Sequence, residues 1–378
     1  MISVRPLLLA VLGLAALAAG CGDDDDDDAS SAQGARTVEV AITDAGCEPA
    51  SLTLKAGPTT FHVTNRGTSQ VNEFEVLDGE QVLAEAENLD DGDDGSFSLT
   101  LKKGEYGLKC PGGETAETGT LTVSGGGAAA ELSAAETATV DRYRDYLEQN
   151  TAELQERTAE FADAVKAGDI EGAKALFATT REPYEAIEPV AESFGDLDPA
   201  IDARINDVDG GFSDWTGFHR LEWSLWKQGK LGAKEKQIAD KLVADVDALA
   251  EKVKTVELEP AQIVNGSNEL LGEVAKSKIT GEEDRYSHTD LWDFQANLDG
   301  SREGFESAKP LLVDSDPELS KEIENRFAAA QEALDRYRKG DGWTLYTELS
   351  EADTRELSQR IDALAEPLSE APGKLVSG

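Results

Sequence analysis

Apolar and polar residues alternate in the first part of the chain, which is the pattern of β-strands with one buried face. The alternating runs occupy residues 38–42, 52–54, 61–63, 97–101, 106–108 and 121–123, and turns that contain glycine separate them. Roughly seven or eight short strands in about ninety residues are typical of a sandwich. The pattern therefore predicts an all-β domain over residues 37–124.

Beyond residue 124 the spacing of the apolar positions changes from two to about 3.6 residues, which indicates helices. A Gly/Ala segment at residues 125–132 is expected to be a flexible joint. Ser133-Ala-Ala-Glu136 is a capping box that opens the first helix, and Pro199 stands at the first position of another. Helices are expected near residues 133–166, 170–194, 214–228, 233–256, 260–277, 288–298, 302–312, 317–338 and 353–370, with no strand. We therefore predict an all-α helical bundle over residues 133–378.

The first residues have the features of an export signal. Arg5 precedes an apolar stretch at residues 7–19, and small residues precede Cys21. Leu17-Ala-Ala-Gly-Cys21 resembles a bacterial lipobox. Residues 1–21 are therefore expected to be a lipoprotein signal peptide, and lipidated Cys21 would anchor the mature protein to the outer face of the cell membrane or in the periplasm. The alternative is simple cleavage, which would give a soluble secreted protein. The acidic run that follows predicts a disordered tether at residues 22–36.

The charge balance limits the partners that this chain can have. It contains 35 lysines and arginines against 76 aspartates and glutamates, for a net charge of −41. This charge excludes nucleic acid and an electrostatic interaction with anionic lipid, and it is expected of a protein that attracts cations or simply of a highly soluble one. With three cysteines in total, the chain is not a disulfide-stapled scaffold.

The densest aromatic run of the chain, residues 213–226, contains the first candidate metal ligands. Ser213 is expected to cap a helix there, and apolar residues follow at helical spacing. His219 and Glu222 are three residues apart and so share one face of this helix. An imidazole and a carboxylate in this arrangement offer two ligands to a metal ion, although the same pair on an acidic surface helix is often only solvated.

Two further segments concentrate carboxylates on predicted helices. Glu185 and Glu188 are again three residues apart, Asp202 follows one short helix later, and residues 281–294 open a helix that is rich in acids. Helical bundles form metal sites from such side chains on facing helices, and oxygen ligands with one imidazole suit iron as well as Mn, Zn or Ca. The predicted ligands are Glu185, Glu188, Asp202, His219, Glu222 and Glu283, with Asp284 and His288 as further candidates, in one site or two. For each carboxylate the alternative is a surface acid or a partner of a helix N-terminus.

Cys47 and Cys110 frame the predicted β-domain and have two possible roles. Outside the cytoplasm they could form a disulfide, whereas as thiolates they could bind a metal ion together with a carboxylate. A blue-copper site would need two histidines beside the cysteine. The domain has only His62, which is out of phase with the core residues Phe61 and Val63, so we exclude an ordinary electron-transfer copper site.

Several motifs resemble one known family. Gly-x-His-x-x-Glu at residues 217–222 is the signature of imelysin-like proteins, residues 181–192 and 281–294 resemble stretches of the EfeO-type iron-uptake lipoproteins, and the strands resemble a cupredoxin-like domain. The resemblance covers nearly all of the mature chain. It implies that Cys47, Glu73 and Cys110 take the ligand places for Cu, Zn or Fe in the cupredoxin-like domain, and that the imelysin-like helical domain binds iron as Fe²⁺ or Fe³⁺. It also implies two partners, a membrane iron permease and a haem-containing peroxidase of the same uptake system.

We therefore expect a non-catalytic carrier that captures iron outside the cytoplasm and passes it to a membrane permease. The first alternative is an imelysin-like metallopeptidase. A zincin requires His-Glu-x-x-His, but no second histidine follows His219 at that spacing, and Trp223 stands where the inverted motif would place one. The second alternative is a surface adhesion module with structural calcium, whose melting temperature would rise with calcium and not with iron.

Overall fold

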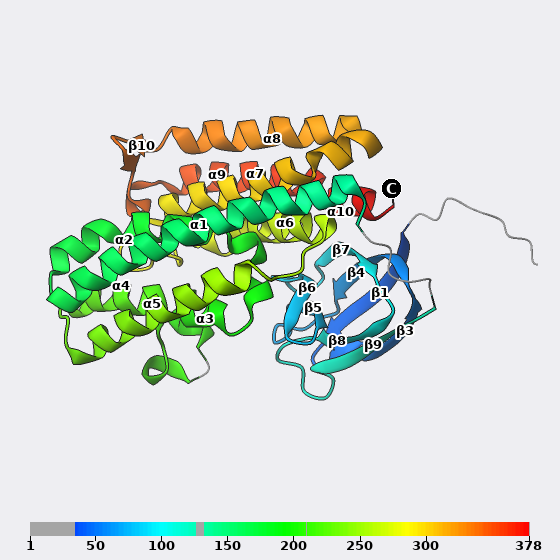
Figure 1. The fold of residues 1–378 in the computed structure, drawn as a ribbon, viewed down its shortest axis with the longest axis horizontal. Coiled ribbons are helices and arrows are strands. Elements are labelled where there is room, and N and C mark those ends of the chain that lie inside the picture. The colour runs from blue at the N-terminus through cyan, green and yellow to red at the C-terminus, as the bar shows by residue number, and fades with distance from the viewer. Residues whose placement is uncertain (1–34, 126–131, 209, 378) are drawn as a thin grey trace, which may run out of the picture. The chain divides into compact units, whose positions relative to one another are not determined.

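The computed structural model describes residues 35–125, 132–208 and 210–377 (Figure 1). The expected signal peptide, Cys21 and nearly all of the predicted tether lie outside these residues. Most of the expected Gly/Ala joint lies outside them as well.

The first described part is a β-sandwich. One sheet has the strand order β2-β1-β4-β7 and the other has the order β3-β9-β8-β5-β6. The strands are β1 (Arg36–Thr43), β2 (Gly46–Glu48), β3 (Ser51–Lys55), β4 (Gly57–Asn65), β5 (Phe74–Asp78), β6 (Gln81–Ala86), β7 (Asp94–Leu101), β8 (Gly104–Lys109) and β9 (Thr118–Ser124). Rings from both sheets meet in the core, where the centroid of Phe61 lies 5.2 Å from that of Phe97 and 5.8 Å from that of Phe74. The predicted all-β sandwich is confirmed.

The second described part is helical, as the change in apolar spacing predicts. Its helices are α1 (Ala134–Ala167), α2 (Ile170–Glu185), α3 (Leu197–Asp202), α4 (Gly217–Trp223), α5 (Ala233–Val253), α6 (Pro260–Lys276), α7 (Asp290–Ser315), α8 (Pro317–Asp335), α9 (Glu351–Leu368) and α10 (Ala371–Val376). The long helix α1 packs along α2 and α5, and α6 packs against α7 and α9 (Figure 1). Among the described residues, no helix combines the length and the apolar character that crossing a bilayer requires.

Some predicted helix boundaries are wrong, for identifiable reasons. The helix expected over residues 170–194 ends at Glu185, and a 3-10 segment, η1 (Glu188–Phe194), follows because Pro189 cannot continue the α-helical hydrogen bonds. The helices expected near residues 288–298 and 302–312 are one helix, α7. Gly300 does not break it, and a Cβ atom there would lie 2.2 Å from the carbonyl oxygen of Ala186, so the residue serves close packing.

Two smaller predictions also differ from the structure. Ser213 does not cap the helix of the His219 motif, because α4 begins later with Thr216 at its N-cap and Ser213 ends a separate 3-10 turn. A short hairpin of β10 (Arg338–Lys339) and β11 (Gly342–Trp343) lies in the part that was expected to contain helices alone.

Helix α6 contacts the β-sandwich through buried hydrogen bonds. The Asn265 side-chain amide donates to the Ser98 carbonyl at 2.9 Å, and its Oδ1 accepts from the Ser98 N–H at 3.4 Å. The Gln262 amide donates to the Leu83 carbonyl at 3.2 Å. Strand β6 and helix α6 therefore lie side by side, and both line the cavity described below.

A disulfide joins Cys47 in β2 to Cys110, the residue after β8. Both side chains are buried in the core of the sandwich. Of the two possible roles of these cysteines, the structure therefore has the disulfide. Disulfide sulfurs are not thiolate ligands. The Cu, Zn or Fe site that the resemblance implied on these cysteines is a wrong prediction for this structure.

Removing this disulfide tests its role in the sandwich. The bond links residues 63 apart, so Cys47→Ala/Cys110→Ala should lower the free energy of unfolding of the sandwich by about 4 kcal/mol. Urea denaturation followed by amide hydrogen exchange measures this change in residues 36–124. All five tryptophans lie beyond residue 200, so the fluorescence transition of the helical part serves as an internal control and should move little. An unchanged stability of the sandwich would contradict the expectation.

Candidate metal centre

The glycine of the Gly-x-His-x-x-Glu motif determines where α4 begins. Gly217 has a φ of 81°, and a Cβ atom at this position would lie 2.1 Å from the carbonyl oxygen of Ile201. Only glycine allows the start of α4 to approach the end of α3 this closely. As a result, His219 in the first turn of α4 lies next to Asp202, the last residue of α3.

The His219 imidazole is 2% exposed and has carboxylates at both of its ring nitrogens. Its Nε2 lies 3.1 Å from Glu283 Oε1 and 3.7 Å from Asp202 Oδ2. Its Nδ1 lies 3.3 Å from Glu222 Oε2 and 4.0 Å from Asp284 Oδ1. Two groups of potential ligands therefore share this imidazole, Asp202–His219–Glu283 and His219–Glu222–Asp284, and the ligand atoms of each group lie within 4.8 Å of one another.

The residues just before α7 hold the second group in place. Glu222 Oε1 accepts hydrogen bonds from the backbone N–H groups of Tyr286 and Ser287, at 2.8 and 2.7 Å. Asp284 Oδ2 accepts a hydrogen bond from the Thr289 hydroxyl. Each carboxylate thus uses one oxygen for these bonds and has the other oxygen near His219. The further candidate His288 belongs to neither group within the described residues.

A fully buried arginine lies at the centre of these carboxylates. Arg181 in α2 forms ion pairs with Asp202 and Glu185, and its Nη2 lies 3.2 Å from Glu283 Oε1. Two more carboxylates, those of Asp284 and Asp293, lie 3.6 Å from its guanidinium nitrogens. Buried charges of one sign are unfavourable without a counter-ion, so this arginine is what allows acids from several helices to share one interior.

Glu185 and Glu188 contact a second buried cation. Lys278 Nζ lies 3.2 Å from Glu185 Oε2 and 2.5 Å from Glu188 Oε1. The side-chain amide of Asn297 donates to both carboxylates, at 2.9 and 2.6 Å. These glutamates therefore lie beside the His219 groups and outside them, although Arg181 connects Glu185 to the cluster. Metal binding by Glu185 and Glu188 stays a prediction.

Charge interactions shift the pKa values within the cluster. Burial raises the pKa of Asp202, but Arg181 and His219 outweigh it and leave that pKa below its ordinary value. Burial also raises the pKa of Glu283. Neighbouring cations outweigh this effect and hold that pKa well below its ordinary range. Burial and Arg181 lower the pKa of His219, but the charge of Asp202 and the hydrogen bonds to Asp202 and Glu222 together outweigh them, so the net pKa lies well above the ordinary value. The imidazolium is thus paired with carboxylates, and a metal ion would have to displace its proton.

Two buried aspartates lack the hydrogen-bond donors that such groups usually have. Within the described residues, Asp284 Oδ1 and both carboxylate oxygens of Asp293 accept no hydrogen bond. Burial raises the pKa of Asp284 to about 7 and the pKa of Asp293 well above its ordinary value. Buried acceptors without donors are unfavourable, and a cation beside them would remove this penalty. The available donors therefore fit a metal ion that prefers oxygen ligands and accepts one imidazole.

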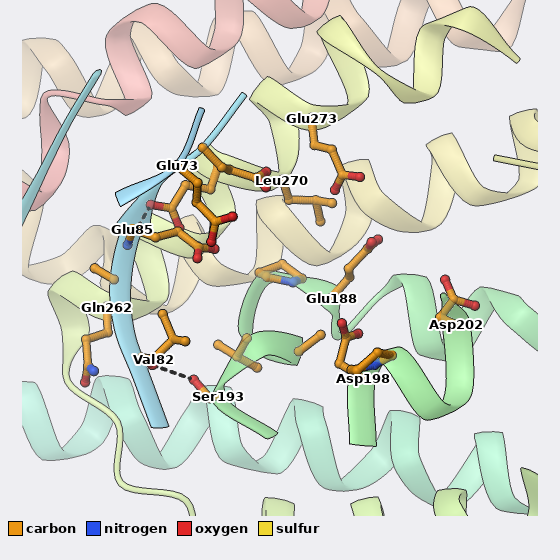
Figure 2. Close-up of a pocket in the computed structure, with 18 of the residues that line it drawn as sticks. Glu73, Val82, Glu85, Glu188, Ser193, Asp198, Asp202, Gln262, Leu270 and Glu273 are labelled. Atoms are coloured by element: carbon orange, nitrogen blue, oxygen red, sulfur yellow. Dashed lines mark hydrogen bonds between the residues drawn. The ribbon is translucent and has the colours of Figure 1, made fainter. Parts of the chain in front are cut away.

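An acidic cavity of about 380 Å³ reaches this cluster. Figure 2 shows its two walls, with Glu73 and Glu85 on the side of the strands and Glu188 and Asp202 on the side of the helical segments. The acids that line it are Glu73, Glu85, Glu87, Glu188, Asp198, Asp202, Asp207, Glu269, Glu273 and Glu283. Because Asp202 and Glu283 belong both to this wall and to a candidate ligand group, the cavity leads directly to the His219 site.

Glu73 lies at the acidic cavity, and its role as a metal ligand stays a prediction. The resemblance placed Glu73 in one ligand set with Cys47 and Cys110, but Glu73 lines the acidic cavity, and neither cysteine is among the residues that line it. The two cysteines bond to each other instead. Glu73 therefore belongs with the acids that surround the helical site.

The cations and the amide that hold the acids together are not among the residues that the sequence motifs indicate. Arg181 could have been found, because it stands four residues before Glu185 and so shares a helix face with it. Lys278 and Asn297 carry no such signal, since they meet the acids of α2 and η1 only through tertiary packing.

Comparison with known proteins identifies the family of this chain. The family model described as Imelysin matches residues 139–371, and the model described as Cupredoxin-like domain matches residues 7–123. The fold and the Gly-x-His-x-x-Glu motif thus define an imelysin-type protein that also has a cupredoxin-like domain.

Relatives that match most of the chain specify the family further. The protein named "Iron uptake system component EfeO" from Escherichia coli O157:H7 is 41% identical over 345 residues, which cover 89% of this chain and 91% of that protein. Proteins of the same name from Escherichia coli K12 and Shigella flexneri are each 40% identical with the same coverage. The chain belongs to the EfeO family, as the motifs of the sequence predicted.

The titration of Asp284 gives a test of the cluster that needs no metal. Its pKa of about 7 exceeds the ordinary aspartate value of 3.8, so between these values the folded chain binds a proton that the unfolded chain has lost, and stability falls as pH rises. Asparagine cannot titrate. The free energy of unfolding of Asp284→Asn, relative to the parent chain, should therefore increase as pH rises from 3.8 to about 7.

Urea denaturation of chelator-treated protein at several pH values measures this difference. Asp314→Asn, which changes an exposed acid in the same helical segment α7, is the matched control. A constant difference for Asp284→Asn would show that Asp284 ionises in its ordinary range.

Proposed function

We propose that this protein captures iron outside the cytoplasm and passes it to a membrane permease, without catalysing a reaction. The observation that carries the proposal is the convergence of Asp202, Glu222, Glu283 and Asp284 on the two nitrogens of one buried histidine, His219. Membership in a family whose members are named iron uptake system components supports iron as the cargo. Carboxylates with one imidazole suit Fe²⁺ and Fe³⁺ alike.

The electrostatics of the chain support this role. The net charge of −41 attracts cations from solution, and the acidic cavity concentrates that field next to the candidate ligands. Ions would thus be drawn toward a wall that already contains Asp202 and Glu283. The buried cations Arg181 and Lys278 balance only part of the negative charge, so the cluster gains stability when a further cation enters.

Export and anchoring complete the proposal. Lipidation at Cys21 would hold the carrier at the membrane that contains the permease, and a haem-containing peroxidase of the same uptake system would act beside them. The support for these partners is the family of the chain and the export-type pattern of residues 1–21.

Peptide hydrolysis is the rival function, because the imelysin family model that matches this chain carries the name of a peptidase family. His219 is the single imidazole in the two ligand groups of the described residues, and both oxygens of Glu222 are occupied, one by backbone N–H groups and the other by His219. Glu222 is therefore not free to act as a general base beside a zinc-bound water. We expect zinc-loaded protein to cleave peptide and protein substrates no faster than a His219→Ala variant, and faster cleavage by the parent would support the peptidase.

Iron titration of His219→Ala tests the carrier function directly. Both ligand groups use this imidazole, so one substitution should abolish both and weaken iron binding by about a hundredfold or more. Metal content after anaerobic loading with Fe²⁺, together with equilibrium titration, measures the loss.

His62→Ala is the matched control. His62 also lies between two carboxylates, 2.8 Å from Glu39 and 3.4 Å from Asp94, but it is partly exposed on the surface of the sandwich. Its replacement should leave iron binding unchanged. If His219→Ala kept the iron affinity of the parent, the proposed site would be wrong.

A further inference from the structure

Arg204 lies where the acidic cavity meets the candidate ligands. It follows α3 in the chain and lines the cavity together with Asp202 and Glu283, which belong to a ligand group. Unlike Arg181 and Lys278, which are almost completely buried, its side chain is 25% exposed. Among the described residues that line the cavity, it is the one basic side chain.

Three carboxylates surround the Arg204 guanidinium, and each contacts a different nitrogen. Nη1 lies 3.0 Å from Glu283 Oε2, which is the oxygen that faces away from His219. Nη2 lies 3.5 Å from Glu273 Oε1, and Nε lies 3.0 Å from Asp207 Oδ2. The arginine therefore occupies an oxygen of a candidate ligand and also has a partner outside the ligand groups.

Asp207 is an ion-pair partner of Arg204 that lies outside the ligand groups. It stands three residues after Arg204 on the same short turn, and its side chain is 47% exposed at the cavity. When the guanidinium leaves Glu283, Asp207 is a half-exposed carboxylate that can still pair with it, so little desolvated charge is left unpaired. Arg181 has no such alternative, because its partners are buried on every side.

We propose that Arg204 closes the candidate metal centre toward the cavity, and that an entering cation displaces its guanidinium from Glu283. This inference rests on the proposed function, since it concerns how the same site is filled. Arg204 acts as a built-in competitor, because it neutralises Glu283 until a divalent or trivalent ion with greater charge replaces it. Monovalent ions carry no more charge than the guanidinium and do not replace it, so Arg204 contributes to selectivity as a positioning residue.

If Arg204 competes with the metal ion, its removal should strengthen Fe²⁺ binding, whereas removal of a purely structural residue should weaken it. Arg204→Gln removes the competing charge, so Fe²⁺ should bind about tenfold more tightly and associate faster than in the parent. If Arg204 merely held Glu283 in position, the same substitution would weaken binding. Arg204→Lys keeps the charge and should return the affinity most of the way to the parent value.

Arg285→Gln is the matched control for the loss of one nearby positive charge. Arg285 borders the same side of His219, but its partners are Glu282 and Asn206, which are outside the ligand groups. Anaerobic Fe²⁺ titration and stopped-flow mixing of the purified full-length variants supply the affinities and rates. The Arg204→Gln variant should bind Fe²⁺ more tightly, and associate with it faster, than the Arg285→Gln variant.

The possible outcomes separate this inference from the proposed function. Tighter and faster binding in Arg204→Gln than in Arg285→Gln, reversed by Arg204→Lys, supports displacement. Equal effects of the two glutamine variants, or weaker binding in Arg204→Gln, overturn it while iron binding by the parent stands. Absence of iron binding in the parent overturns the proposed function and this inference together.

Discussion

The buried guanidinium of Arg181 is the interaction on which the helical interior depends. It pairs with carboxylates from α2, from the end of α3, from the segment before α7 and from α7 itself. Without this cation the carboxylates would repel one another in a medium that screens them poorly, and the helices that carry them would separate. The same crowding leaves acids such as Asp293 without hydrogen-bond donors, so the constraint that holds the fold together also creates a place for a further cation.

The β-sandwich has its own core and contributes acids to the cavity that reaches the helical interior. Its disulfide and its three packed phenylalanine rings form a core of its own, and α6 contacts it through Asn265 and Gln262. The acids near β6 then line a cavity whose other side contains Glu188 and Asp202 (Figure 2). Glu283 lines the same cavity. Within the described residues the two cysteines of the cupredoxin-like fold form a disulfide, and this fold supplies part of the acidic lining of the cavity.

The sequence predicts those features that local spacing encodes. Period-two and helical periodicity give the two fold classes, and the three-residue spacing of His219 and Glu222 places both at the centre of the candidate site. Local spacing does not predict contacts between residues that are far apart in the chain. The two helices expected near residues 288–298 and 302–312 are one, in which Gly300 is a packing contact. Cys47 and Cys110 fit thiolates and a disulfide equally in the sequence. The ion pairs of Glu185 and Glu188 with Lys278 depend on an element far away in the chain.

The most direct test of the central claim is the location of iron in a crystal of the full-length protein, measured by anomalous scattering on both sides of the iron absorption edge. We predict a peak within coordination distance of His219 Nε2 or Nδ1, with carboxylate oxygens of Asp202 and Glu283 or of Glu222 and Asp284 as the other ligands. A fully occupied iron peak elsewhere, for example among the acids near β6 with none beside His219, would contradict the account.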